Sequence, residues 1–135
     1  MNIEPMEVPP LSLTYKKKVT SSSNPNPAWH VITAINNGDW AGHFWVPDAN
    51  DERPWIEFDL GKPEKVSKVI FFESGKAIKA FEIQYQKRNN LETVYVGDEV
   101  ESGRAINLKE FTAQKIRVTI TAFSEVPGIY EVIFL

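Results

Sequence analysis

Aromatic and planar polar side chains gather in one stretch of the sequence, between Ser21 and Pro54. It contains three of the four tryptophans, both histidines and many Asn, Asp and Pro residues, and its polar and apolar positions hardly alternate. A tryptophan ring can stack on the apolar face of a pyranose, and planar polar groups can form paired hydrogen bonds to hydroxyls. Long irregular connections inside compact domains are uncommon and often functional. The stretch therefore predicts a sugar-binding site that includes Trp29, His30, Asp39, Trp40, His43 and Arg53.

Each of these residues also has a purely structural interpretation. Trp29 follows an Asn-Pro-Asn-Pro run and could equally plug the end of the fold, and a histidine in a loop is more often a structural hydrogen bonder than a ligand contact. Arg53 follows Asp51 and Glu52, with which it can form a surface ion pair of little energetic value. Trp40 follows Gly38-Asp39 and precedes Ala41-Gly42, so we expect it at an exposed loop tip.

Catalytic groups are present by residue type but not in a catalytic arrangement. Glu57 and Asp59 share the outer face of one predicted strand, roughly 7 Å apart, and a convex sheet face forms no cleft between two such carboxylates. The serine run 21–23 lacks a nucleophile elbow and is typical of a strand end with a turn. No glycine-rich phosphate loop follows a predicted strand. We expect no catalysis by this chain.

Composition narrows the function classes further. The chain has 135 residues, no cysteine and two histidines, which excludes disulfides, thiolate zinc sites and three-histidine metal sites. A net charge of −3 and a pI near 5.4 argue against binding to nucleic acid through phosphate neutralisation. No window is long and apolar enough for a membrane span. The acidic residues of the irregular stretch make an anionic membrane an unlikely target, so neither nucleic acid nor membrane insertion is expected.

The elements that must position these residues are β-strands, because the dominant periodicity is two. We expect an edge strand within Leu11–Thr20 and seven further strands after it. They are Trp55–Leu60, Val66–Phe72, Phe81–Gln86, Thr93–Val96, Ala105–Leu108, Ile116–Thr121 and Ile129–Phe134. Turn signals separate them at Gly61-Lys62-Pro63, Ser74-Gly75, Asn89-Asn90, Gly97-Asp98, Ser102-Gly103 and Pro127-Gly128. A single helical turn is expected around Trp29–Ile35. The sequence predicts an all-β antiparallel sandwich or jelly roll.

The first ten residues differ from the rest. Pro5, Pro9 and Pro10 favour extended backbone, and the segment has neither a basic start nor an apolar signal core. We expect residues 1–10 to be a linker or an artificially added segment and residues 11–135 to be one domain, cut from a longer polypeptide.

Several segments, in this order and spacing, resemble the discoidin or factor V/VIII type C family, which includes the family 32 carbohydrate-binding modules. They are Ala34–Asp39 followed by Trp45, then Pro54–Gly61, Val66–Phe72, Ile116–Val118 and Gly128–Val132. Within this family, the chain is most similar to the domains appended to bacterial family 29 α-L-fucosidases. There, a strand that ends in glutamate and glycine precedes a Phe-Glu-Ile-Gln-Tyr strand, as Glu73, Gly75 and Phe81–Tyr85 do here. The resemblance implies an eight-stranded, galactose-binding-domain-like jelly roll with Trp45 and Trp55 in its core. It also brings the loop 124–128 to the predicted site and adds Glu125 as a candidate.

The same resemblance implies a structural calcium ion. The family binds it through an aspartate, a threonine, a late glutamate and backbone carbonyls; here Asn36 or Asn37 stands at the aspartate position and His43 at the threonine position. Glu131 matches the glutamate, and Asp39 could supply the missing carboxylate. The alternative is that Asn36 and Asn37 only form a turn in which Gly38 takes a positive φ.

By resemblance, the function is non-catalytic binding of terminal galactose-, fucose- or N-acetylhexosamine-type sugars, on behalf of the catalytic domain of a parent glycosidase. A secreted, periplasmic or cell-surface location follows from the same resemblance. Two alternatives stay open: a spacer or packing domain with no ligand, and a protein-binding adhesion domain.

Overall fold

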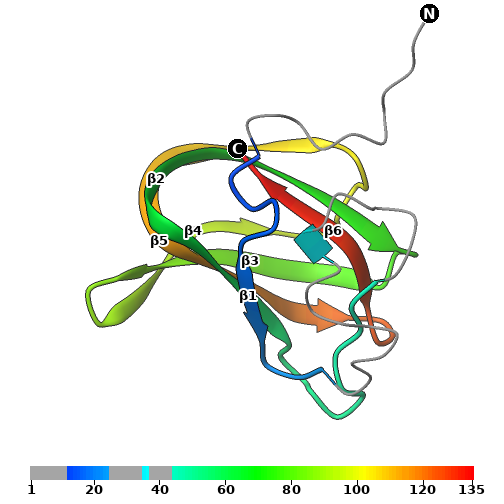
Figure 1. Ribbon diagram of the computed structural model, residues 1–135. Coiled ribbons are helices and arrows are strands. Elements are labelled where there is room, and N and C mark those ends of the chain that lie inside the picture. The colour runs from blue at the N-terminus through cyan, green and yellow to red at the C-terminus, as the bar shows by residue number, and fades with distance from the viewer. Residues whose placement is uncertain (1–11, 25–34, 37–43) are drawn as a thin grey trace, which may run out of the picture.

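Six antiparallel strands form the fold of the protein in a computed structural model that describes residues 12–24, 35–36 and 44–135 (Figure 1). They are β1 (Lys18–Ser21), β2 (Trp55–Ser74), β3 (Ile78–Lys87), β4 (Asn90–Gly97), β5 (Ala105–Phe123) and β6 (Gly128–Phe134). Their order in the sheet is β1-β2-β5-β3-β4, and β6 also pairs with β2. The predicted all-β antiparallel class is confirmed.

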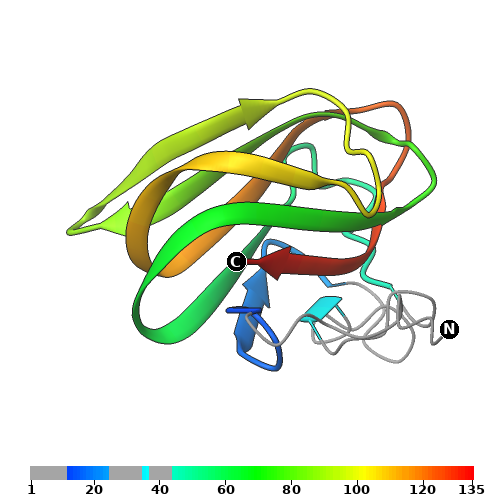
Figure 2. The same cartoon turned by 90° about the horizontal axis from the view of Figure 1, so that it is seen from above.

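The two long strands, β2 and β5, each run through both layers of the fold. The first half of β2 pairs with β1 and its second half pairs with β6, while β5 follows it along both halves. Figure 2 shows the two strands curving together from one layer to the other. The sequence-based prediction treated each half of β2 and of β5 as a separate strand, so its eight strands correspond to these six.

The bend of β2 falls where the sequence predicted a turn, at Gly61-Lys62-Pro63. Pairing with β5 is interrupted between Asp59 and Glu64 and then resumes, so the prediction of a strand end there was wrong. Gly61 has a φ of 86°, and its N–H donates to Asp59 Oδ1 at 2.9 Å. A glycine fits because most side chains disfavour positive φ. The residue therefore makes a corner without ending the strand.

The core lies between the layers and follows the predicted alternation. Ile56, Phe58 and Leu60 are buried while Glu57 and Asp59 face outward, and the same pattern holds along β3 and β5. Trp45 is fully buried, as predicted. Burying one large apolar side chain stabilises the folded state by about 1.5–3 kcal/mol. A register shifted by one residue would expose these side chains, so the alternation fixes the strand register.

Trp55 is not in the core, and that prediction was wrong. The alternation that buries Ile56 turns Trp55 to the outer face of β2, where it is half-buried. The predicted edge strand is also shorter than expected, because only Lys18–Ser21 pairs with β2. Of the helix expected around Trp29–Ile35, only Ile35 lies within the described residues; with Asn36 it forms a short 3₁₀ segment. No helix in the described ranges is long and apolar enough to cross a membrane.

Candidate functional site

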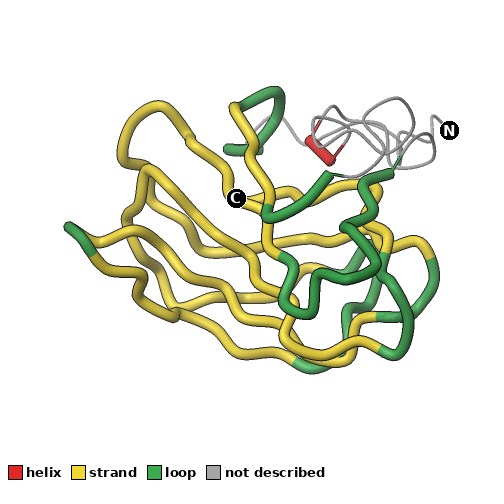
Figure 3. The backbone as a smooth tube through the Cα atoms, turned by 90° about the horizontal axis from the view of Figure 1, so that it is seen from below, coloured by secondary structure: helices red, strands yellow, loops and turns green. Residues whose placement is uncertain are grey.

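Loops from four parts of the chain meet at one end of the fold, which we call the loop end. Because β2 and β5 fold back on themselves, both ends of each strand return to this end, where Ser21 pairs with Ile56 and Ser74 with Gly128. The loops 75–77, 98–104 and 124–127 therefore lie near the described parts of the stretch 22–54. Most described loops lie opposite the β3–β4 hairpin (Figure 3). The topology thus brings the described parts of the irregular stretch and the Glu125 loop to the same end.

The serines after β1 hold the part of this stretch that precedes β2. Ser22 Oγ and Ser23 Oγ donate to Asp51 Oδ2 at 2.5 and 2.8 Å, and Asp48 N donates to Ser23 Oγ at 2.8 Å. Trp45 Nε1 donates to Ser23 O at 3.0 Å. These contacts give the serine run a structural role and agree with the prediction of a strand end and turn.

Arg53 lies at the loop end but is turned toward the outer face of β3. Its Nη2 is 3.7 Å from Glu82 Oε2, and 61% of its side chain is exposed. The ion pair that the sequence offered as an alternative is present, although its partner is Glu82 instead of Asp51 or Glu52. The energetic value of such an exposed pair is about 0–1 kcal/mol, so Arg53 can exchange it for a ligand.

Glu125 lies exposed in the loop after β5. That loop is attached to the turn before β3, because Ser124 N donates to Ala77 O at 2.9 Å. No hydrogen bond or ion pair joins Glu125 to Arg53, both of which are described. The other predicted sugar-binding residues, Trp29, His30, Asp39, Trp40 and His43, lie outside the described residues.

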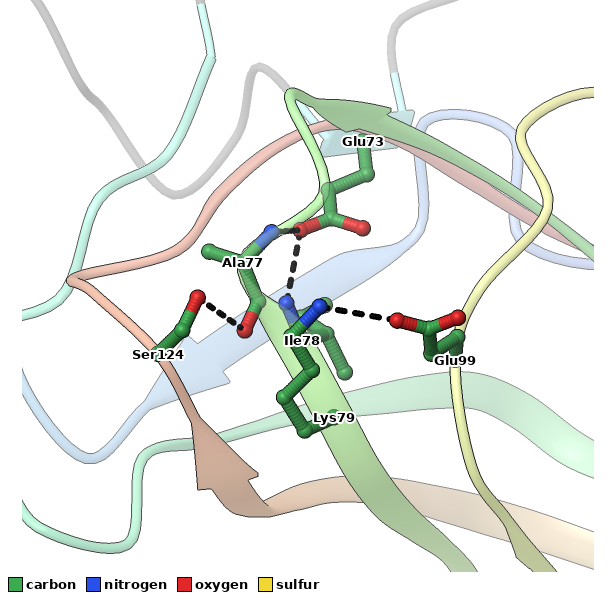
Figure 4. A network of polar contacts seen from close by, with 6 residues as sticks. All are labelled: Glu73, Ala77, Ile78, Lys79, Glu99 and Ser124. Atoms are coloured by element: carbon green, nitrogen blue, oxygen red, sulfur yellow. Dashed lines mark hydrogen bonds and ion pairs between the residues drawn. The ribbon is translucent and has the colours of Figure 1, made fainter.

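Glu73, at the end of β2, anchors two of the loops from inside. Its carboxylate oxygen Oε2 accepts hydrogen bonds from Ala77 N at 2.7 Å and Ile78 N at 2.9 Å (Figure 4). Its own N–H donates to Ser102 Oγ at 2.9 Å. The residue is 93% buried, since only 7% of its surface is exposed, and burial raises the pKa of its carboxyl group above the ordinary value of 4.5. Glu73 thereby fixes the loops 75–77 and 98–104 relative to each other.

A groove of about 670 Å³ separates these two loops, and we call it the lateral groove. One wall is formed by Gly75, Lys76 and Ile78, and the other by the segment 98–102. Ion pairs fix two of its acids: Lys79 Nζ lies 2.8 Å from Glu99 Oε2, and Arg104 pairs with Glu101. The pKa of Glu99 is held below its ordinary value by its hydrogen bond to Lys79. The lateral groove is thus a cavity with charged side chains in both walls.

Two of the predicted calcium ligands, Asn36 and Glu131, are described, whereas Asn37 and Asp39 are not. Asn36 is buried, and its Nδ2 donates to Thr14 O at 2.8 Å and Lys17 O at 2.7 Å. A calcium ion needs oxygen atoms directed toward it, whereas Asn36 presents N–H groups to two carbonyls. Glu131 is buried in β6, and the described ranges contain no cluster of three or more metal-ligating His, Cys, Asp or Glu. The described donors alone do not fit calcium, and the ion stays a prediction.

The carboxylates weighed for catalysis are engaged in contacts along the strands. Arg117 Nε donates to Glu57 Oε2 at 3.1 Å, and Asp59 Oδ1 accepts from Gly61 N and from Gln114 Nε2 at 3.1 Å. The bond from Gly61 and then that from Gln114 lower the pKa of Asp59. Both groups thus have structural partners.

Sequence reasoning missed Glu73 and the segment 98–102 as parts of the loop end. Glu73 precedes Ser74-Gly75, a pattern typical of an exposed turn, and no local feature indicates that it is buried. The apolar run that precedes Glu73 is the one weak signal, because it indicates a buried strand that could extend to this residue.

Solved structures of known proteins share the fold. Chitosan-binding module 1 of a chitosanase/glucanase from Paenibacillus sp. IK-5 is similar with a TM-score of 0.80 and 21% identity, over 92% of this chain and 98% of that one. The module CpGH89CBM32-5 of Clostridium perfringens, in complex with GalNAc-β-1,3-galactose, is similar with a TM-score of 0.75 and 16% identity, over 87% and 94%.

A longer protein contains a similar domain. The GH29 fucosidase of Ruminococcus gnavus, in complex with fucose, matches with a TM-score of 0.79 and 21% identity over 91% of this chain, which spans only 26% of the fucosidase. A comparison with curated protein sequences gave no significant match. The profile of the F5/8 type C domain matches residues 18–132, in agreement with the strand order and the buried Trp45. The chain therefore belongs to the F5/8 type C domain family.

Proposed function

We propose that this domain is a non-catalytic glycan-binding module that binds terminal sugars at its loop end. The observation that carries the proposal is the return of both long strands to one end, which brings four loops together there. The similar Paenibacillus module is named for chitosan binding, and the Clostridium module was solved with a disaccharide. Both comparisons support a glycan as the ligand.

A single stacked sugar in a shallow site binds near the millimolar range, about −4 kcal/mol. Such affinity is useful mainly through avidity, when the module is linked to a catalytic domain that engages the same glycan. We infer that the parent protein is a bacterial glycoside hydrolase such as an α-L-fucosidase, acting outside the cytoplasm.

The test is a titration of labelled protein with galactose, fucose and N-acetylhexosamines, followed by NMR. We expect at least one sugar to shift the resonances of Trp40 or His43, and Trp40→Ala to abolish the shifts without lowering the melting temperature. Leu91→Ala, at the far end of β4, is the matched control for loss of an exposed apolar side chain. If neither these sugars nor a broad glycan array perturb the loop end, the proposal fails.

A packing domain without a ligand is the second candidate, favoured by the fucosidase in which a similar domain forms about a quarter of the chain. It requires Trp29 and Trp40 to be buried or to face a missing neighbour. Iodide quenching of tryptophan fluorescence separates the two candidates, because exposed indoles are quenched strongly and buried ones only slightly.

A further inference from the structure

We propose that the lateral groove binds the second residue of an uncharged oligosaccharide whose terminal sugar occupies the loop-end site. This inference rests on the proposed function and extends it, because it assigns the module to glycan chains instead of single terminal sugars.

The position of the groove suits a chain that continues from the loop end. The turn 75–77 lies between two other loops: Ser124 contacts Ala77 on one side, and Glu99 lies on the other (Figure 4). The groove lies on the Glu99 side of the turn, between the turn and the segment 98–102, and the predicted site residue Glu125 follows Ser124 in the chain. A glycan crossing the turn would contact both regions. The volume of about 670 Å³ lies within the range of about 300–1,000 Å³ that is usual for small-molecule sites.

The walls of the groove are fixed by backbone contacts. Glu73 binds the N–H groups of Ala77 and Ile78 in one wall and the hydroxyl of Ser102 in the other. Gly103 N also donates to Phe71 O at 2.8 Å, which ties the second wall to β2. A cavity formed in advance loses little conformational freedom when a ligand enters. These contacts therefore favour a binding site over a gap between mobile loops.

The chemistry of the lining suits sugar hydroxyls, which both donate and accept hydrogen bonds. Lys76 supplies a donor and Asp98 an acceptor, above the buried apolar side chains of Ile78 and Val100. Asp98 has no ion-pair partner among the described residues, whereas Glu99 and Glu101 are paired. Acids outnumber bases in the lining, which disfavours anionic sugars.

The test compares saccharides of different length on the wild-type chain and on two variants. Galactose, fucose and N-acetylglucosamine are titrated beside GalNAc-β-1,3-galactose and chitotriose, and the amide resonances of Lys76 and Ser102 report on the groove. Asp98→Asn removes the charge and one of the two acceptor oxygens of this unpaired carboxylate. Glu110→Gln is the matched control, because it removes the same charge from an exposed site on β5 near the bend, away from the loop end.

We expect monosaccharides to shift loop-end resonances only, and at least one oligosaccharide to shift Lys76 and Ser102 as well. Asp98→Asn should weaken oligosaccharide binding about fivefold and leave monosaccharide binding unchanged, as the loss of one charge-assisted hydrogen bond predicts. The inference is overturned, with the proposed function intact, if both ligand classes shift the same resonances or if Asp98→Asn acts like Glu110→Gln. If no saccharide shifts any loop-end resonance, the proposed function fails and this inference fails with it.

Discussion

The guanidinium carbon of Arg117 lies 3.9 Å from the centre of the Trp55 ring, and its Nε donates to Glu57. The register explains the contact, because Glu57 lies opposite Arg117 and Trp55 is two residues earlier on the same face of β2. A planar guanidinium can stack on an indole while it binds a carboxylate. Trp55 is therefore held on the outer face by a cation–π contact.

We expect Arg117 and Trp55 to be energetically coupled. A double-mutant cycle with Arg117→Ala and Trp55→Ala should give a coupling free energy of about 0.5–1 kcal/mol, measured by urea denaturation. Arg117→Lys should lose most of it, because an ammonium group cannot stack in the same way. Pairing Arg117→Ala with Glu110→Gln serves as a control and should be additive. A coupling near zero for Arg117 with Trp55 would show that their proximity has no energetic consequence.

Replacing Glu73 tests its role as a loop anchor. Glu73→Ala leaves the N–H groups of Ala77 and Ile78 without their acceptor and should cost about 2 kcal/mol or more in unfolding free energy at pH 7. Glu73→Gln retains one acceptor oxygen and should cost less. Equal losses for Ala and Gln in chemical denaturation would mean that the hydrogen bonds contribute nothing.

The titration of Glu73 should also leave a pH signature. Burial raises its pKa in the folded state, while nearby Lys79 acts to lower it and Glu99 to raise it. The folded protein then binds this proton more tightly than the unfolded chain does. The stability contributed by binding this proton is therefore complete below pH 4.5 and is lost as pH rises through the higher folded-state pKa. Unfolding free energies from pH 4 to 7 should show this fall in the wild type and not in Glu73→Gln; parallel curves would contradict the assignment.

Chelation separates the two interpretations of Asn36. Because its amide already bonds Thr14 O and Lys17 O, we expect EDTA to leave the melting temperature of the wild type unchanged. Asn36→Asp places a carboxylate against two carbonyls and should cost about 2 kcal/mol in EDTA, with partial recovery in millimolar calcium. A lower wild-type melting temperature in EDTA would instead support the calcium site. Asn50→Asp, on an exposed loop, controls for the added charge.

Gly97, which precedes the second wall of the lateral groove, should not tolerate a side chain. A Cβ there would lie 2.6 Å from Phe81 Cζ and 2.8 Å from Tyr95 Cε2, and Phe81 is buried. Gly97→Ala should cost about 1–3 kcal/mol by overpacking. Gly75→Ala, with a φ of 88° and no atom within 4 Å, should cost about 1–2 kcal/mol through backbone strain alone. Equal melting temperatures for wild type and Gly97→Ala would show that Phe81 can move.

The sequence was a reliable guide wherever one face of a strand is buried and the other is wet. Ile56, Phe58 and Leu60 alternate with acids, and a shift of one residue would bury charges, so periodicity alone predicts this part of the core. It could not predict that β2 continues through Gly61, because a glycine at a strand corner looks the same in sequence as a glycine that ends a strand.

Residues of the candidate site were predictable only where side chains suited to binding lie close together in the sequence. Arg53 and Glu125 lie at the loop end, whereas Asp98 and Glu73 come close to it only through pairings between distant strands. The contact between Glu73 and Ser102 joins residues 29 positions apart, and no local pattern indicates it. The composition of one stretch therefore indicated the loop end. The groove, in contrast, is formed by contacts between segments that are far apart in the sequence.

The continuity of β2 and β5 links the two layers through shared backbone. In a sandwich made of separate strands, one layer can fray while the other stays intact. Here, opening either layer disrupts a strand that also builds the other, so partial unfolding is unfavourable and the domain should melt as one cooperative unit. A scaffold of this kind can carry loops of widely varying sequence at one end, because changes there do not reach the corners that hold the layers together.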